Sequence, residues 1–275
     1  MKIANSIWVL ELVAGVCTLK ESKLTKSLYF RSLNSLMLGF CLLFPYRVLA
    51  LQKFESGLNQ TNTIELFSSE GCSSCPPAEK WFGQLRDHSG LWKTFVPVEF
   101  HVDYWNQLGW IDPYSNQLFT QRQNTYAKQW GSKTVYTPGF VLNGREWTER
   151  KKSDLEKMGP KVGNLIITEK NDQKFEIEFK PSKKELERVI IYFALLANGL
   201  TSKVKAGENG GETLKHEFVA LQLSSEETPL IGSKFKTLID VKNLKRKANM
   251  RYSVVAWVSS LDSQVPIQAV GGDLN

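Results

Sequence analysis

The stretch TIELFSSEGCSSCPP, from Thr63 to Pro77, decides the fold that this sequence predicts. It begins with a short apolar run, breaks at Gly71, and then presents a pair of cysteines, Cys72 and Cys75. Behind the pair, apolar side chains recur with the three- and four-residue spacing of one helix face, which predicts an amphipathic helix. These side chains belong to Ala78, Trp81, Phe82 and Leu85. The predicted order is therefore strand, tight turn, cysteine pair and helix.

A C-x-x-C pair at the start of a helix is suited to redox chemistry. The unpaired backbone N–H groups and the dipole of the helix stabilise a thiolate at this position. Cys72 lies nearer the helix tip and is the predicted solvent-accessible nucleophile, whereas Cys75 lies further in and is the predicted resolving cysteine. The pair therefore predicts thiol-disulfide exchange, in which a thiolate attacks a substrate disulfide and the second cysteine resolves the mixed disulfide.

Two other interpretations of the cysteine pair stay open. The pair could form a structural disulfide in a non-catalytic binding module, although closing so short a loop adds little stability. It could also bind copper, as in a carrier protein, but two thiolates do not complete a metal site and His101 would have to join them. His101 is the candidate metal ligand outside the pair, and the sequence otherwise predicts no metal and no cofactor.

Composition and charge fit a globular protein. The chain has 275 residues, of which 42% are hydrophobic and 23% are charged, and its formal net charge is +7. Its basic clusters, at 150–152 and 242–247, are not interleaved with aromatic residues as a nucleic-acid-binding surface would be. We interpret them as solvated loops and expect no nucleic-acid partner.

Residues 1–50 have the composition of a targeting segment. A basic region precedes an apolar run and a small-residue cleavage site, which is the order of a secretory signal peptide. These features are Lys23, Lys26 and Arg31, the run 36–44, and the sequence 48–50. We predict cleavage after Ala50 and an extracytoplasmic location, periplasmic or secreted, whereas an uncleaved segment would act as a membrane tether. Cleavage would also remove Cys17 and Cys41, so that the C-x-x-C pair would remain alone.

Residues 61–160 predict a first domain that alternates strands and helices. After the cysteine helix come a strand, an aromatic loop, a helix that begins at Asp112-Pro113, a hairpin at Asn143-Gly144 and a last short helix. The ranges are 95–103 for the strand, 104–110 for the loop, 112–131 for the helix, 140–148 for the hairpin and 149–158 for the last helix.

Polar and aromatic residues near the cysteines and the second strand are candidate site residues. His101 and Asp103 alternate along the predicted strand and therefore share a face, which could line the groove beside the dithiol. Asp103 and Glu70 are the candidate proton acceptors. Trp105 is the candidate aromatic wall for a substrate.

This order of elements resembles the thioredoxin fold. In that family a cis-proline before the third strand faces the C-x-x-C pair and shapes the substrate groove, and Pro138 stands in the matching place. The resemblance implies that Thr137 and Pro138 shape a substrate groove, and the residues themselves make Trp105, together with Trp110, the candidate aromatic wall for a peptide. Two positions depart from the thioredoxins: Ser-Ser separates the cysteines, and Leu66 stands where a buried acid serves as proton acceptor.

Five motifs together carry a closer resemblance. They are ELFSSEGCSSCPPAE, FHVDYWNQLGWIDPY, Arg122-Gln, VYTPGFVLNG and GENGGETLKH. Jointly they are similar to one uncharacterised secreted thioredoxin-like family, the domain of unknown function 1223, over residues 62–270. Membership would imply the thioredoxin-like fold and the extracytoplasmic location. The family has no assigned reaction.

Residues 163–275 predict a second domain made of strands. Apolar and charged residues alternate along 174–180, which is typical of a half-buried strand, whereas 189–196 is continuously apolar, which indicates a strand buried on both faces. We predict an antiparallel β-sandwich, because no helix pattern interrupts these strands. The Gly-rich segment 207–212 is expected to be a turn packed against the first domain, and His216 to be structural.

The sequence as a whole predicts an α/β thioredoxin-like fold followed by an all-β, antiparallel sandwich-like C-terminal domain. Its predicted function is a secreted or periplasmic thiol-disulfide oxidoreductase that uses the Cys72-Ser-Ser-Cys75 pair. The expected partners are disulfides of proteins or of small thiols.

Overall fold

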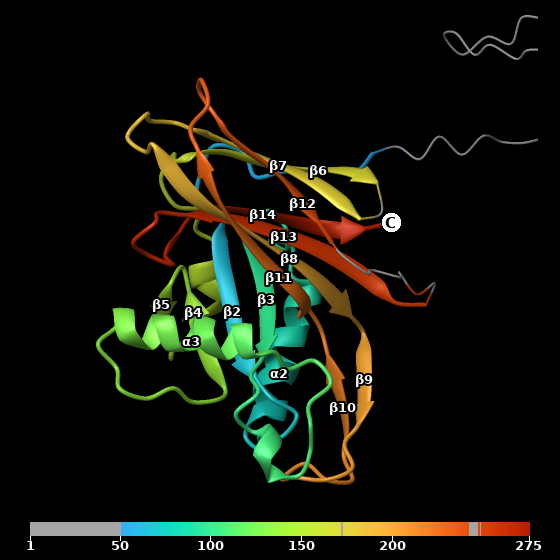
Figure 1. Cartoon of the computed structure of the whole chain (residues 1–275). Coiled ribbons are helices and arrows are strands. Elements are labelled where there is room, and N and C mark those ends of the chain that lie inside the picture. Colours follow the sequence, from blue (N-terminus) through green and yellow to red (C-terminus); the bar gives the residue numbers. More distant parts are fainter. Residues whose placement is uncertain (1–50, 172, 242–246, 248) are drawn as a thin grey trace, which may run out of the picture. The chain divides into compact units, whose positions relative to one another are not determined.

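Eight strands join in one continuous sheet at the centre of the structure (Figure 1). The computed structural model describes residues 51–275, apart from 172, 242–246 and 248, and these belong to one compact unit. The strands lie in the order β14-β13-β8-β11-β3-β2-β4-β5. Their bounds are β2 Asn62–Ser68, β3 Phe95–His101, β4 Gly139–Leu142, β5 Arg145–Glu146, β8 Arg188–Asn198, β11 Val219–Pro229, β13 Arg251–Ser259 and β14 Pro266–Leu274. The predicted signal peptide lies outside the described residues.

A second, four-stranded sheet packs against part of the first. It has the order β1-β6-β7-β12, and all its neighbouring strands are antiparallel. The bounds are β1 Lys53–Glu55, β6 Gly163–Asn171, β7 Lys174–Pro181 and β12 Phe235–Asp240. Alternate residues of β7 are buried, as predicted, and they share one hydrophobic core with β8 and β13. The two sheets therefore form a sandwich over this core.

Strand β8 is buried on both faces, as its apolar sequence predicts. Val189, Ile191 and Phe193 belong to the core between the two sheets. Ala194 and Leu196 belong to a second core, which also contains side chains of the helices. A strand between two cores has no polar face, which explains why this run is continuously apolar.

Two α-helices, α2 (Cys75–Gly83) and α3 (Gln117–Gln129), are present in the described residues. Helix α2 begins at the second cysteine, and two prolines occupy its first turn, where the missing N–H groups cost no helix hydrogen bond. Helix α3 is capped by the side chain of Asn116, which accepts a hydrogen bond from the backbone N–H of Leu118 (2.9 Å). Neither helix is long and apolar enough to cross a membrane.

The predicted start of α3 at Asp112 is wrong. The Asp112 carboxylate accepts hydrogen bonds from the backbone N–H groups of Glu70 (2.8 Å) and Tyr114 (2.9 Å), so it holds a loop instead of a helix end. The predicted helix at 149–158 is also wrong, because only a short 3₁₀ turn forms there. The three 3₁₀ turns in the described residues are η1 Gln84–Asp87, η2 Asn106–Leu108 and η3 Lys152–Leu155.

Strands β9 (Leu200–Lys203) and β10 (Thr213–His216) form a separate hairpin. In the sequence this hairpin follows β8 and precedes β11. This hairpin extends beyond the large sheet and runs alongside α2 (Figure 1). We call residues 204–212, which connect its two strands, the hairpin tip. The chain then enters β11, which pairs with β8 in the antiparallel sense and with β3 in the parallel sense.

The expected fold class, an α/β thioredoxin-like fold followed by an all-β sandwich-like domain, is wrong. The described residues are mostly strand, with only the two α-helices, and they form an all-β sandwich-like arrangement. The physical reason is that β11 pairs with β3, so that strands from the C-terminal half extend the sheet that contains β2. Spacing along the sequence indicates which face of a strand is buried, but it does not indicate the strand's neighbour.

Arg122 attaches α3 to the sheet. Its buried guanidinium donates two hydrogen bonds to the Glu65 carboxylate, 2.6 and 2.9 Å long, and one to the Tyr126 hydroxyl (2.8 Å). The guanidinium carbon also lies 4.8 Å from the centre of the Trp257 ring. Two buried charges therefore neutralise each other in apolar surroundings, where either alone would be costly.

Replacement of Arg122 should be strongly destabilising, because it leaves the Glu65 carboxylate buried without a counter-ion. We expect Arg122→Met to lower the free energy of unfolding by about 3–5 kcal/mol, measured by urea denaturation. The double variant Glu65→Leu, Arg122→Met removes both charges and should recover most of this loss. A double variant no more stable than Arg122→Met would contradict this explanation.

Candidate functional site

The cysteine pair lies at the start of α2 and is joined by a disulfide. Cys75 is the first residue of the helix and Cys72 lies in the preceding turn, with their Cα atoms 5.5 Å apart. The backbone N–H of Cys72 donates to the Ser69 carbonyl and that of Cys75 to the Cys72 carbonyl, both at 3.1 Å. The predicted tight turn followed by a helix is confirmed. The pair therefore lies where the helix dipole favours negative charge.

Both cysteines are buried in this disulfide form. The relative exposure is 1% for Cys72 and 0% for Cys75, whereas Ser73 and Ser74 between them are exposed. The expectation that Cys72 is solvent-accessible is therefore wrong for this form. Two segments distant in sequence contact the cysteine turn, the hairpin tip and the turn that contains Pro138, and we call them the dithiol cover.

The hairpin tip is hydrogen-bonded to the cysteine turn. The side-chain amide of Asn209 donates to the carbonyls of Glu70 (2.9 Å) and Cys72 (3.0 Å). The carboxylate of Glu208 accepts from the backbone N–H (3.0 Å) and the hydroxyl (2.7 Å) of Ser73. The prediction that this Gly-rich turn packs against the first predicted domain is confirmed, and its contact is the turn that holds the dithiol.

The three predicted groove residues lie together beside Cys72. The Thr137–Pro138 peptide bond is cis, as predicted, and the Cys72 Sγ lies 3.8 Å from the Thr137 carbonyl oxygen. The indole N–H of Trp105 donates to the Thr137 hydroxyl (2.8 Å). Gly71 permits this close packing, because a Cβ atom there would lie 3.0 Å from the Cβ of Trp105.

The two candidate proton acceptors are engaged with other partners. The Glu70 carboxylate accepts from the indole N–H of Trp110 (2.7 Å) and lies 3.2 Å from Nε2 of His216. The Asp103 carboxylate accepts from the Thr120 hydroxyl (2.6 Å). In the part of the chain that the structure describes, neither carboxylate hydrogen-bonds a cysteine sulfur.

His101, the candidate metal ligand, is paired with carboxylates. Its Nδ1 lies 2.7 Å from Asp112 and its Nε2 lies 3.4 Å from Glu99. Burial lowers the pKa of His101, but Asp112 and Glu99 outweigh this effect and raise the pKa well above its ordinary value. Burial, together with the nearby charge of Glu79, raises the pKa of Glu99 to about 7.

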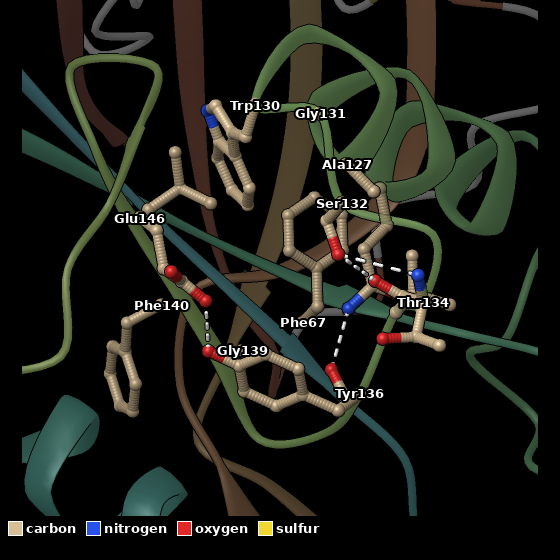
Figure 2. A pocket seen from close by; sticks show the side chains of 13 residues that line it. Phe67, Ala127, Trp130, Gly131, Ser132, Thr134, Tyr136, Gly139, Phe140 and Glu146 are labelled. Atoms are coloured by element: carbon tan, nitrogen blue, oxygen red, sulfur yellow. Dashed lines mark hydrogen bonds between the residues drawn. The ribbon is translucent and has the colours of Figure 1, made fainter.

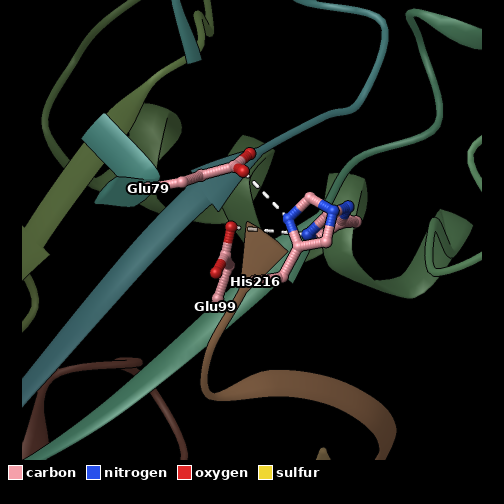
Figure 3. A group of neighbouring side chains, drawn as sticks. Glu79, Glu99 and His216 are labelled. Carbon is pink, nitrogen blue, oxygen red and sulfur yellow. Dashed lines mark hydrogen bonds and ion pairs between the residues drawn. The ribbon is translucent and has the colours of Figure 1, made fainter. Parts of the chain in front are cut away.

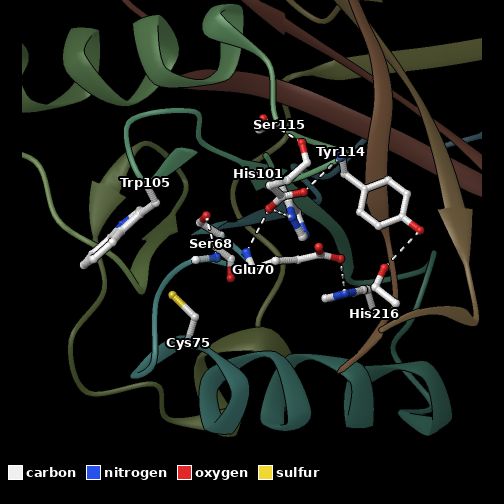
Figure 4. Close-up of polar contacts among 12 residues, drawn as sticks. Ser68, Glu70, Cys75, His101, Trp105, Tyr114, Ser115 and His216 are labelled. Atoms are coloured by element: carbon white, nitrogen blue, oxygen red, sulfur yellow. Dashed lines mark hydrogen bonds and ion pairs between the residues drawn. The ribbon is translucent and has the colours of Figure 1, made fainter. Parts of the chain in front are cut away.

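His216 extends this network toward the cysteine turn (Figure 4). Its Nδ1 lies 2.9 Å from Glu79 and its Nε2 lies 3.2 Å from Glu70, and its ring centre is 5.1 Å from that of His101. Burial lowers the pKa of His216, but hydrogen bonds to Glu70 and Glu79 outweigh it and raise the pKa to about 9. The network is continuous with the dithiol cover, because Asn209 holds the carbonyl of Glu70.

Sequence reasoning missed most of this network. It placed His101 and Asp103 on one strand face, but β3 ends at His101 and Asp103 lies in the following loop. A usable signal exists in β3, where Glu99 and His101 alternate in an otherwise apolar run and therefore face the same layer. No local pattern links this pair to Glu79 and His216, which come from other elements.

A pocket of about 190 Å³ lies between the end of α3 and β4 (Figure 2). Trp130, Tyr136 and Glu146 line it, and the Tyr136 hydroxyl donates to the Glu146 carboxylate. Its volume is below the roughly 300–1,000 Å³ of typical small-molecule sites. Neither cysteine lines it. We therefore locate the candidate functional site at the dithiol and not in this pocket.

Comparison with known proteins identifies a family. The family model described as "Protein of unknown function (DUF1223)" matches residues 63–259. No curated protein matches the chain.

Two solved structures are similar to this fold. The X-ray crystal structure of protein AGR_C_4864 from Agrobacterium tumefaciens is 21% identical, with a TM-score of 0.58 over 76% of this chain and 92% of that chain. The structure described as HBP35 of Porphyromonas gingivalis is 12% identical, with a TM-score of 0.55 over 80% of this chain and 76% of that chain. At these identities the likeness shows the fold alone.

Loss of the Asn209 amide should open the cover over the dithiol. Asn209→Ala removes two of the four hydrogen bonds described above between the hairpin tip and the cysteine turn and leaves the two of Glu208 in place. We expect dithiothreitol to reduce the disulfide at least about 5-fold faster, since a loss of about 1–3 kcal/mol in local stability raises the open population by about 5- to 160-fold. Thiol trapping followed by intact-mass measurement gives the rate.

Asn124→Ala is the matched control, because it removes an exposed amide of α3 that donates to the Thr120 carbonyl. Its reduction rate should equal that of the wild type. Equal rates for Asn209→Ala and the wild type would show that the hairpin tip does not limit access to the disulfide.

Proposed function

The chain belongs to the DUF1223 family of proteins of unknown function, and we propose that it acts as a thiol-disulfide oxidoreductase through Cys72 and Cys75. One observation carries the proposal: the disulfide lies at the start of α2, with the Cys72 Sγ 3.8 Å from the Thr137 carbonyl oxygen. The start of the helix favours a thiolate. The Thr137–Pro138 segment places backbone and side-chain groups next to the sulfur, which we call the edge of the site.

The surroundings of Cys72 favour its thiolate after reduction. The first backbone N–H groups of α2 have no partner within the helix, and the helix dipole is positive at this end. The Ser74 hydroxyl lies 3.3 Å from the Cys72 Sγ and can donate a hydrogen bond to a thiolate there. The Glu208 carboxylate opposes this stabilisation of the thiolate from its place on Ser73. If the hairpin tip moved away, the Glu208 charge would leave the site and the Cys72 sulfur would become exposed at the same time.

Exchange proceeds in two steps that balance. The Cys72 thiolate attacks one sulfur of a substrate disulfide, a Cys72–substrate bond forms, and the other substrate sulfur leaves as a thiolate. The Cys75 thiolate then attacks the Cys72 Sγ, which forms the Cys72–Cys75 disulfide and releases the second substrate thiolate. The substrate gains two electrons and the chain loses two, and the reverse sequence oxidises a substrate dithiol.

The proposed substrates are disulfides of proteins or of small thiols. Ser73 and Ser74 are exposed beside the dithiol, and Trp105 and Thr137 form a hydrogen-bonded edge next to it. A substrate segment can lie along this edge once the hairpin tip has moved away. Backbone groups at such an edge bind extended peptides with little dependence on sequence.

The burial of both cysteines favours a second candidate, a binding module in which the disulfide is structural. In that case the hairpin tip is a permanent part of the fold, and neither cysteine reacts while the chain is folded. Disulfides of this kind resist reduction by glutathione. The two candidates differ in whether the folded chain forms a mixed disulfide.

Trapping of that intermediate tests the proposal. Cys75→Ser keeps the nucleophile and removes the resolving cysteine, so we expect it to form a stable adduct with glutathione disulfide, seen as an increase in intact mass and assigned to Cys72 by peptide mapping. Cys72→Ser keeps the deeper cysteine and should form its adduct at least about 10-fold more slowly. A folded Cys75→Ser variant without an adduct at Cys72 would favour the structural disulfide.

A further inference from the structure

Four side chains with metal-binding atoms converge in the interior (Figure 3). They are Glu79 from α2, Glu99 and His101 from β3, and His216 from β10, which we call the Glu/His cluster. One ligand atom from each lies within 4.8 Å of those of the other three, and each residue is at most 4% exposed. Neither cysteine belongs to this set, so the cluster is chemically separate from the dithiol.

Two atoms of the cluster face each other in a long ion pair, Oε1 of Glu99 and Nε2 of His101, which are fully buried and lie 3.4 Å apart. Within the described residues, neither atom forms a hydrogen bond. A buried polar atom without a partner costs about 1–3 kcal/mol. Most such atoms in proteins are satisfied by a protein group, a water or an ion. A cation bound between these two atoms would satisfy both.

Each histidine of the cluster is oriented from behind by a carboxylate outside it. Asp112 lies 2.7 Å from Nδ1 of His101, which leaves Nε2 for an ion. Glu70 lies 3.2 Å from Nε2 of His216, which leaves Nδ1 for an ion. A carboxylate on the far ring nitrogen is the usual support of a metal-binding histidine, because it fixes the tautomer and the ring orientation.

The spacing of the ligand atoms suits a tetrahedral ion. Zinc bonds of about 2.0–2.1 Å place neighbouring ligand atoms roughly 3.3 Å apart at tetrahedral angles. The distance is 3.4 Å between His101 Nε2 and Glu99 Oε1 and 2.9 Å between His216 Nδ1 and Glu79 Oε2. All the ligand atoms lie within 4.8 Å of one another, so the wider pairs must approach by at most about 1.5 Å to reach this spacing.

We propose that the Glu/His cluster binds one zinc ion. Two imidazoles and two carboxylates form a nitrogen and oxygen donor set that suits Zn²⁺, whereas Cu⁺ selects thiolate or thioether sulfur. Four protein ligands without an open position are typical of a structural zinc site, not of a catalytic one. The ion therefore has a structural role in this fold.

A zinc ion at this place would support the dithiol from beneath. It joins α2, β3 and β10, and the cysteine turn lies between Glu70 and Glu79 in the sequence. Glu79 ligates the ion directly, and Glu70 holds the ring of His216. Because the site is closed, the ion enters as the chain folds, and its binding free energy adds to the folding free energy.

Refolding of the full chain with and without metal tests the proposal. The chain is unfolded in guanidinium with a chelator, refolded with either zinc chloride or chelator, and passed through gel filtration. We expect about one retained zinc ion per chain by elemental mass spectrometry. We also expect a thermal unfolding midpoint at least about 5 °C above that of the chelator-refolded chain. Equal midpoints with no retained zinc would overturn the proposal.

Single variants test the ligands. Glu99→Gln keeps the shape of a ligand and removes its charge, and Asp112→Asn changes only the support of His101. We expect about 10- to 100-fold weaker zinc affinity for Asp112→Asn, measured by competition with a chromophoric chelator, and a larger loss for Glu99→Gln. His88→Gln alters the histidine outside the cluster and should bind zinc as the wild type does. Wild-type affinity in Glu99→Gln would overturn the proposal.

The double variant Cys72→Ser, Cys75→Ser removes both thiols and leaves the Glu/His cluster unchanged, so it should retain zinc. Loss of zinc in this variant alone would assign the metal to the thiolates and overturn the proposal. If a cluster variant does not fold, the wild-type chain refolded with Co²⁺ decides the question. We expect the visible bands of tetrahedral cobalt without a thiolate charge-transfer band, and the presence of that band would overturn the proposal.

Discussion

The pairing of β11 with β3 positions everything that surrounds the dithiol. Val219 at the start of β11 lies opposite Glu99, near the end of β3, so the chain must reach this end of the sheet before β11 begins. The residues just before it are β10 and the hairpin tip, which therefore lie over the end of the sheet from which the cysteine turn emerges. One long-range strand pairing thus explains why the hairpin tip contacts the cysteine turn and why His216 lies close to Glu70 and Glu79.

The same end of the sheet contains most of the buried charge of the site. Each of the two buried histidines lies between two carboxylates, and such pairs are tolerated in an interior only when their partners are held in good geometry. Glu70 belongs to both parts of the site, because its carboxylate holds His216 and its carbonyl is held by Asn209. Opening of the dithiol cover and rearrangement of the charged network are therefore physically linked. A zinc ion in the Glu/His cluster would confine such motion to the hairpin tip.

The local part of this site could be predicted from the sequence, and the long-range part could not. The helix behind Cys75 depends on residues that are neighbours in the chain, whereas the cis bond before Pro138 was implied by the resemblance to thioredoxins. Glu79 and His216 are 137 positions apart and meet only because distant strands pair, which no local periodicity encodes. The predicted fold class was wrong for the same reason, because the sequence indicates the individual strands but not which strands are neighbours in the sheet. Asp112 has the local pattern of a helix cap, but besides Tyr114 its partners are Glu70 and His101, which come from other segments.

The reduction potential of the Cys72–Cys75 pair decides whether this pair is redox-active in the folded chain. The full chain is equilibrated in glutathione buffers of graded ratio, its free thiols are trapped, and the reduced fraction of the pair is measured by mass spectrometry of the peptide that contains it. A redox-active pair should have a midpoint between about −270 and −120 mV, the range of working exchangers. A pair that stays oxidised below about −300 mV, as structural disulfides do, would contradict the proposed redox activity.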